Sequence, residues 1–413
     1  MIKRFIVIVA VFSAVMANAQ ENVSSPYSYF GIGLTNFKGT VENRSMGGLN
    51  IFSDSIHVNL QNPAGYGRLK LTNYAVGGSY ENTKMKTTDK QDRAKNTSLD
   101  YLAIGVPVGK IGFGLGVMPF TSVGYRVLDI QDEVASQLNG RGGMNKVFLS
   151  AGYEISKSFS FGVDVDYNFG NFQNIRKVAR AGIDLGTKDI ARTDIQGFNF
   201  NFGLDYQAMI SDRLQLHASA TYAPEATLTS ENYREVGTLA FLQSGEVVIE
   251  KEELNVPDSD FTLPSKYSFG AGIGMPHSWF VGAQYTNLAS SSFTGSFNTS
   301  NENVRYQDAV HYNVGGYFIP QYNSITSYFS RVVYRGGFRY EETGLNINNQ
   351  SIDEFGISFG LGLPVGPTFS NVNLGIEYGQ RGTTDSNLIQ ENFFKVSVGL
   401  SLNDKWFVRR KFN

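Results

Sequence analysis

The stretch "SFSFGVDVDYNFG", residues 158–170, alternates strictly between apolar side chains and polar side chains or glycine. Its apolar positions are Phe159, Phe161, Val163, Val165, Tyr167 and Phe169. A period of two residues indicates a β-strand with one apolar and one polar face. The stretches "GFNFNFGLDY" (197–206) and "NVNLGIEYGQ" (371–380) repeat the pattern, so we expect an all-β protein.

Similar segments follow one another from residue 70 onward, and they predict about 14 strands in even number. They cover 70–82, 97–107, 111–127, 143–155, 158–172, 193–210, 214–224, 264–274, 278–288, 305–319, 329–341, 351–363, 370–380 and 389–401. Short connections at 108–110, 155–157, 211–213 and 275–277 alternate with long ones, which all fall at one end. Short periplasmic turns and long external loops are typical of a transmembrane antiparallel β-barrel, which we place at 70–402.

A soluble sandwich or propeller can also alternate, but the strands favour a barrel in lipid. A tilted strand needs about 9–11 residues to cross the hydrocarbon layer, and these segments reach that length. Closure removes the unpaired backbone edge that an open sheet would expose to lipid. No period of about 40–50 residues marks propeller blades. We therefore expect outer-membrane lipids as the surroundings of this fold.

The first 19 residues are expected to be a secretory signal peptide. Lys3 and Arg4 precede an apolar run, and Ala17 and Ala19 frame a cleavage site. The run is too short to span a bilayer as a helix. This predicts an exported protein in the outer membrane of a Gram-negative-type bacterium.

The composition excludes several classes of site. The chain has no cysteine, so neither a disulfide framework nor a thiolate zinc site is expected. The net charge of -2 and pI of about 6.1 provide no basic footprint for nucleic acid. The 45 glycines, 22 tyrosines and 31 phenylalanines suit β-structure.

No motif supports an enzyme, a cofactor or a metal site. The histidines lie far apart in the sequence, at His57, His217, His277 and His311. The stretch "GISFG" (356–360) resembles a nucleophile elbow around Ser358, but that motif requires a strand-to-helix turn and this one lies inside a strand. The glycines of "GFGLG" (112–116) and "GAGIG" (270–274) lie in strands as well, where they leave room for something bulky to approach the wall from inside.

Charged residues on the polar strand faces are expected to point into the barrel lumen. They are Glu154, Asp164, Asp166, Asp205, Glu377 and Lys395. They either line a conduit or bind a plug, or they are simply solvated in the lumen. The acidic connection 224–261 also has two interpretations, an ordered external hairpin or a solvated loop.

Three short stretches resemble the FadL-type family of outer-membrane transporters. "SMGG" (45–48) and "NPAG" (62–65) precede the first strand, and "FTLPSKYSFGAGIG" (261–274) follows the longest external connection, with Trp279 and Tyr285 beyond it. The resemblance implies a 14-stranded barrel with an N-terminal hatch inside the lumen, and passage of hydrophobic compounds through a lateral opening. It places Gly47, Gly48, Asn62, Pro63 and Ala64 in the hatch.

These observations divide the chain into a signal peptide (1–19), an N-terminal extension and hatch (20–69), the barrel (70–402) and a periplasmic C-terminal tail (403–413). The aromatic stretch "SPYSYFGIGLTNF" (25–37) and the tail "NDKWFVRRKFN" are both expected in the periplasm, where they are candidate docking surfaces.

The leading hypothesis is passive transport of hydrophobic small molecules, gated by the hatch. The alternative is an accessory or plug-like subunit of an outer-membrane export or assembly complex, such as the type 9 secretion translocon. An outer-membrane hydrolase ranks last, because no Ser/His arrangement has supporting context. A transporter should contain an apolar pocket behind the hatch and a gap in the wall, whereas a subunit should have a filled lumen.

Overall fold

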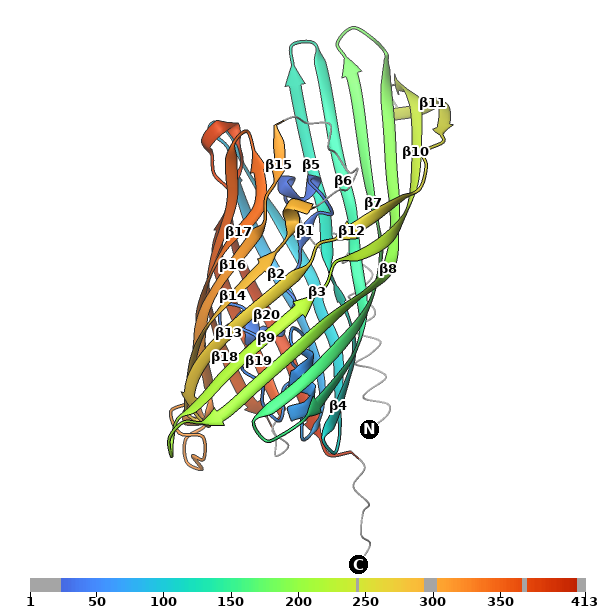
Figure 1. Cartoon of the computed structure of the whole chain (residues 1–413). Coiled ribbons are helices and arrows are strands. Elements are labelled where there is room, and N and C mark those ends of the chain that lie inside the picture. The colour runs from blue at the N-terminus through green and yellow to red at the C-terminus, as the bar shows by residue number, and fades with distance from the viewer. Residues whose placement is uncertain (1–23, 243–244, 293–302, 366–369, 407–413) are drawn as a thin grey trace, which may run out of the picture.

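The protein is a closed antiparallel barrel of 14 wall strands (Figure 1). The computed structural model describes residues 24–242, 245–292, 303–365 and 370–406. The wall strands are β2 (Thr72–Lys86), β3 (Gln91–Val108), β4 (Ile111–Pro119), β6 (Val134–Glu154), β7 (Phe159–Arg180), β8 (Leu185–Met209), β9 (Gln215–Ala223), β13 (Lys266–Met275), β14 (Trp279–Leu288), β16 (Ala309–Phe318), β17 (Val333–Ile347), β18 (Gln350–Val365), β19 (Ser370–Arg381) and β20 (Gln390–Asp404). The predicted signal peptide and most of the predicted tail lie outside the described residues.

The ring closes where β2 pairs with β20, from Thr72 opposite Asp404 to Lys86 opposite Gln390. Three wall strands are interrupted by one or two residues and then continue as a separately numbered strand. β5 (Thr121–Gln131) continues β4, β10 (Ala226–Leu242) continues β9, and β12 (Ser259–Leu263) leads into β13. The remaining strands are β1 (Leu34–Thr35), β11 (Gly245–Leu254) and β15 (Val304–Tyr306). Short helices are η1 (Pro26–Tyr29), α2 (Val41–Arg44), η2 (Pro63–Arg68), η3 (Ser290–Ser292), η4 (Phe329–Arg331) and η5 (Asp385–Asn387).

The burial pattern is inverted relative to a soluble protein. On β7 the large apolar Phe161 and Phe169 are each 37% exposed on the outside, whereas Asp164 and Asp166 are buried inside. An apolar outer belt around a polar interior suits a barrel surrounded by lipid. None of the helices among the described residues is long and apolar enough to cross a membrane.

The acidic connection after β9 is folded. β10 and β11 form an antiparallel hairpin, with Arg234 opposite Leu254 and Leu242 opposite Gly245. The hairpin interpretation is therefore confirmed, and the solvated-loop interpretation is wrong. Figure 1 places this hairpin at the upper end of the barrel, beside the tall strands β5 to β8.

One connection at the periplasmic end breaks the rule of short turns. Between β16 and β17 the chain runs through 319–332 and includes η4. It packs beside the 276–278 turn, where the Ile319 N–H donates to the Ser278 carbonyl and the Tyr322 ring stacks on His277. The expectation that all long connections lie at the external end is therefore wrong.

Candidate functional site: the plugged lumen

The N-terminal part of the chain lies inside the barrel and forms two plugs. We call residues 40–69 the hatch and residues 24–36 the upper segment. The hatch contacts the periplasmic half of the wall, and the upper segment contacts the external half. The luminal hatch confirms the fold predicted from the sequence.

The first turn of the hatch folds through local capping. The Thr40 hydroxyl caps α2 by accepting from the Asn43 N–H, and the Asn43 side chain completes a capping box. The Asn43 amide also donates to the Leu49 carbonyl at 2.7 Å. Gly47 and Gly48 end this turn with φ of 69° and 88°, a conformation that favours glycine.

Hatch residues 62–64 form a second capped turn. The Asn62 carboxamide oxygen accepts from the Ala64 N–H at 3.1 Å, and its nitrogen donates to the Leu204 carbonyl on β8 at 2.9 Å. Pro63 starts η2, where its missing N–H costs nothing. One side chain thus both folds the turn and attaches it to the wall.

Glycines on the inner wall allow the hatch to approach the strand backbones. A Cβ atom at Gly162 would lie 2.3 Å from the Pro63 carbonyl carbon, and one at Gly112 would lie 1.8 Å from the Tyr66 carbonyl oxygen. On the opposite wall, a Cβ at Gly337 would lie 2.1 Å from the Gly47 nitrogen. Any larger residue at these positions would displace the hatch.

Hydrogen bonds link the same hatch turn to the wall. Ser358 accepts from the Gly47 N–H at 3.0 Å, and Asn313 donates to the Gly47 carbonyl at 2.5 Å. The serine that resembled a nucleophile is therefore buried in a structural contact.

Five of the six predicted luminal charges are acidic, and each faces a Lys or Arg from residues 38–70 of the chain. The pairs are Arg68–Asp205 at 2.6 Å, Lys70–Glu154 at 2.8 Å, Lys38–Asp164 at 3.7 Å, Lys38–Asp166 at 3.9 Å and Arg44–Glu377 at 3.9 Å. Asp166 also binds Lys146 at 2.7 Å. Lys395 instead pairs with Glu81 of the neighbouring strand at 2.7 Å.

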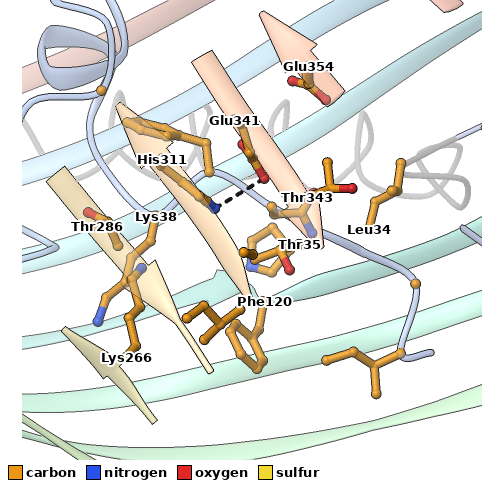
Figure 2. A pocket seen from close by; sticks show the side chains of 18 of the residues that line it. Leu34, Thr35, Lys38, Phe120, Lys266, Thr286, His311, Glu341, Thr343 and Glu354 are labelled. Carbon is orange, nitrogen blue, oxygen red and sulfur yellow. Dashed lines mark ion pairs between the residues drawn. The ribbon is translucent and has the colours of Figure 1, made fainter. Parts of the chain in front are cut away.

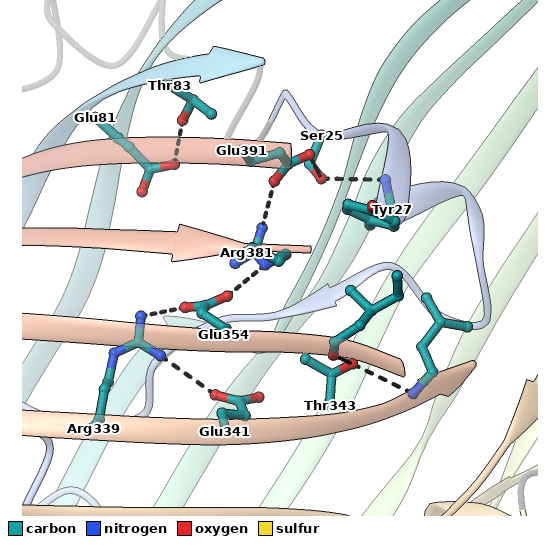
Figure 3. Close-up of polar contacts among 12 residues, drawn as sticks. Ser25, Tyr27, Glu81, Thr83, Arg339, Glu341, Thr343, Glu354, Arg381 and Glu391 are labelled. Atoms are coloured by element: carbon teal, nitrogen blue, oxygen red, sulfur yellow. Dashed lines mark hydrogen bonds and ion pairs between the residues drawn. The ribbon is translucent and has the colours of Figure 1, made fainter. Parts of the chain in front are cut away.

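A larger charge network lines β17 to β20, and the sequence analysis missed its arginines. Arg339 and Arg381 both contact Glu354, and Arg381 also binds Glu391 at 3.0 Å (Figure 3). Arg339 binds Glu377 as well, at 2.7 Å. Buried charges of opposite sign in contact satisfy one another without water. The sequence did contain a signal for these arginines. In "RYEE" (339–342) and "EYGQR" (377–381), Arg339 and Arg381 occupy the alternate positions that face the lumen.

The periplasmic face of the hatch holds a histidine between carboxylates. His57 Nδ1 lies 2.7 Å from Asp54 Oδ2, and Nε2 lies 4.0 Å from Glu42 Oε1. Burial works to lower the pKa of His57, but the attraction of Asp54 and its hydrogen bond outweigh burial, so this pKa is raised above its ordinary value.

The upper segment is attached near the external end of the lumen. Ser25 Oγ donates to Glu391 Oε1 at 2.5 Å, and the Tyr27 hydroxyl donates to the Ile389 carbonyl at 2.6 Å. Tyr27 packs in an apolar cluster with Leu345 on β17, and Ile32 packs in a second apolar cluster with Val123 on β5. The stretch 25–37 therefore lies inside the barrel, and its predicted periplasmic location is wrong.

The upper segment also fills an interruption in the wall. The β3–β4 ladder ends at Leu102 opposite Val117, and among the described residues no ladder joins the upper part of β3 to β5. There β1 pairs with β5 instead, with Leu34 opposite Ser122. The Ser25 N–H donates to the Gly124 carbonyl on β5 at 2.8 Å, and the Ser24 hydroxyl lies 3.0 Å from the Asn96 side chain on β3.

A cavity of about 400 Å³ remains between the two plugs. Lys38, Lys266, Glu341 and His311 border it, together with Phe120, and His311 Nε2 lies 3.3 Å from Glu341 (Figure 2). Apolar and charged side chains both line it, and charged ones such as Arg339, Glu354 and Arg381 would not be expected in the apolar pocket of a carrier for hydrophobic molecules.

A closed 14-stranded barrel with a luminal hatch defines the class: a FadL-like barrel of the outer-membrane type. Within that class, the chain belongs to the BamG family, which it matches over residues 1–413. No curated protein matches the sequence.

Several solved structures share the fold at low sequence identity. The CymD monoaromatic hydrocarbon channel is 13% identical, with a TM-score of 0.56 over 90% of this chain and 99% of that chain. The toluene transporter TodX of P. putida is 14% identical, with a TM-score of 0.54 over 90% and 100%. A FadL homologue from Pseudomonas aeruginosa is 12% identical, with a TM-score of 0.55 over 90% and 98%.

Proposed function

We propose that the protein is a non-enzymatic subunit of an outer-membrane assembly complex, in which its own N-terminal segment keeps the lumen closed. The name of its family, BamG, points to such a complex. The observation that carries the proposal is the hatch, which is attached to opposite walls through contacts such as Arg68–Asp205 and Gly47–Ser358.

Removing the hatch from this position would be costly. Arg68 Nε donates to Asp205, and its two terminal nitrogens donate to the carbonyls of Lys157 and Ser158 at 2.8 and 2.9 Å. Opening the hatch would break this buried ion pair and both of these hydrogen bonds together. A passive channel that opens at every passage is poorly served by such contacts.

Transport of hydrophobic small molecules, the leading hypothesis from the sequence, is retained as the second candidate. The interruption between β3 and β5 favours it, because a gap in the wall is what lateral release requires. CymD and TodX are named for hydrocarbon and toluene transport. The charged side chains in the cavity lining and the upper segment in the gap weigh against this candidate. The family name BamG points to an assembly complex of the outer membrane, and not to the type 9 secretion translocon that the sequence suggested as an example.

Affinity purification from native outer membranes tests the proposal. We expect the protein to be recovered in stoichiometric amounts with other outer-membrane proteins. Depletion of the protein should cause that complex to fall apart. Recovery of the barrel alone, with slower uptake of a hydrophobic growth substrate after its deletion, would overturn the proposal in favour of transport.

A further inference from the structure

Part of the barrel wall continues well beyond the membrane belt. Along the outer face of β7, Phe169 is followed by Asn171, Gln173, Ile175 and Lys177, so most positions there are polar or charged. The outer face of β8 changes in the same way, from Phe198 to Arg192. Because polar and charged residues leave the lipid-facing belt, the strands above this level stand in the external solvent.

These strands form an ordered sheet above the barrel. β5, β6, β7, β8, β10 and β11 pair in that order, and the β7–β8 ladder continues to Ala179 opposite Gly186 (Figure 1). Charge pairs join neighbouring strands, with Arg234–Asp189 at 2.8 Å and Lys251–Glu235 at 3.1 Å. A lumen needs no such extension, so the sheet requires another explanation.

The sheet ends at β11 with a free backbone edge. Among the described residues β11 pairs with β10 alone, so its other row of N–H and C=O groups has no strand partner. The register shifts between Thr238 and Leu239, which leaves Ile249 bulged and 62% exposed. Beyond the bulge, Glu250–Leu254 forms a straight run. An exposed edge of this kind is a template for an added strand.

The charge of β11 selects the occupant. Its acidic residues are Glu246, Glu250, Glu252 and Glu253, and Lys251 is its single basic residue. Two copies of β11 placed edge to edge would oppose like charges, which is destabilising. An anionic lipid surface would be repelled for the same reason. An extended segment carrying Lys or Arg would gain both backbone hydrogen bonds and charge pairing.

We propose that the Glu250–Leu254 edge of β11 binds an extended, basic segment of a partner protein, which adds as a further strand to the external sheet. Ile249 supplies an apolar contact at the start of this edge. The inference rests on the proposed role as a complex subunit, because it assigns the surface through which one partner is held.

Photo-crosslinking in intact cells tests this surface. A photoreactive residue replaces Ile249, and in a control chain it replaces Ile183, which is 51% exposed in the turn between β7 and β8. We expect an adduct with one other protein at 249 and not at 183. Mass spectrometry of the adduct should locate the crosslink in a segment bearing Lys or Arg.

The charge requirement is tested in the same cells. The double substitution Glu250→Lys and Glu252→Lys should reduce the adduct yield about tenfold. Glu133→Lys, at the distant turn between β5 and β6, should leave the yield unchanged. Heat-dependent migration on SDS gels checks that every variant still forms the barrel.

Several results would overturn the inference. They are an adduct with a second copy of the chain, an adduct with lipid alone, no adduct at 249, or a yield unaffected by the double substitution. If the protein still co-purifies with a complex but gives no adduct at 249, only this inference fails. If it is recovered alone as well, the proposed function fails with it.

Discussion

The hatch and the upper segment belong to one continuous stretch of chain, yet they are attached to the barrel in different ways. The hatch is held by a buried ion pair at Arg68 and by backbone contact with wall glycines such as Gly162. The upper segment is held by hydrogen bonds at Ser25 and Tyr27, by the two-residue β1–β5 ladder and by apolar packing. The hatch is therefore fixed by buried charge and close backbone packing, whereas the contacts of the upper segment can break one at a time.

This difference separates a permanent stopper from a removable seal. A buried ion pair cannot be released gradually, because a partly opened hatch leaves one buried charge without its partner. Individual hydrogen bonds contribute about 1–3 kcal/mol each, with the bond from Ser25 to the Glu391 carboxylate toward the upper end, and they can break in sequence. We infer that the hatch closes the periplasmic half permanently, and that any rearrangement begins in the upper segment.

The largest expected effect comes from Arg68→Met. This substitution leaves Asp205, which is 0% exposed, without its cation, and should lower the free energy of unfolding by about 3–5 kcal/mol. Lys70→Met is the matched control, because the Lys70 side chain is 55% exposed and its pair with Glu154 should contribute less than about 1 kcal/mol. Urea unfolding in lipid vesicles measures both, and equal losses would contradict a charge-locked hatch.

Gly162→Ala should have the next largest effect. The new Cβ would lie 2.3 Å from the Pro63 backbone, so the hatch must shift, at a cost of about 1–3 kcal/mol. Gly336→Ala provides the control on another strand, because its Cβ would meet no atom closer than the Phe359 ring at 3.8 Å, an ordinary van der Waals distance. Thermal unfolding should distinguish the two variants. Similar melting temperatures would remove the argument for close backbone contact.

Tyr27→Phe should loosen the upper segment without weakening the barrel. It removes the bond that the hydroxyl donates to the Ile389 carbonyl and the bond that it accepts from the Ile389 N–H, each contributing about 1 kcal/mol. Amide exchange in residues 24–36 should become several times faster while the barrel melting temperature stays unchanged. Tyr340→Phe, which loses a bond to Asp353 on the wall, should leave that exchange unchanged. A large fall in barrel stability with Tyr27→Phe would mean that the upper segment is structural as well.

The smallest effect is expected for His57→Gln, and it should depend on pH. The pKa of His57 is raised in the folded protein, so its stabilising charge is fully present below the unfolded pKa of about 6.5 and is lost as pH rises through the folded pKa. The variant should unfold more readily than the wild type near pH 5 and match it near pH 9. A difference that grows with pH would contradict this assignment.

The barrel was predictable because its strands carry the information locally. Alternation in residues such as Phe159 and Phe161 defines a strand, and closure follows from the need to pair every edge in lipid. The location of the upper segment was not predictable. Its contacts, such as Ser25 with Glu391, join residues 366 positions apart, and neither partner has a local signature of that pairing.

The candidate site was predictable only in part. The acidic luminal residues are visible as inward positions of alternating strands, but their cations come from irregular chain, where Arg44 and Arg68 have no periodicity to indicate a direction. The ordered β10–β11 hairpin and the long connection at 319–332 depend on tertiary packing around each segment, which composition alone does not reveal.

A covalent lock tests most directly whether the hatch is a stopper. The chain has no native cysteine, and the Val41 Cβ lies 3.2 Å from a Cβ built at Gly399, close to disulfide spacing. Cells whose only copy carries Val41→Cys and Gly399→Cys should assemble the complex and grow like the wild type when the bridge is oxidised. Loss of function on oxidation, with recovery on reduction, would contradict the account and show that the hatch must open.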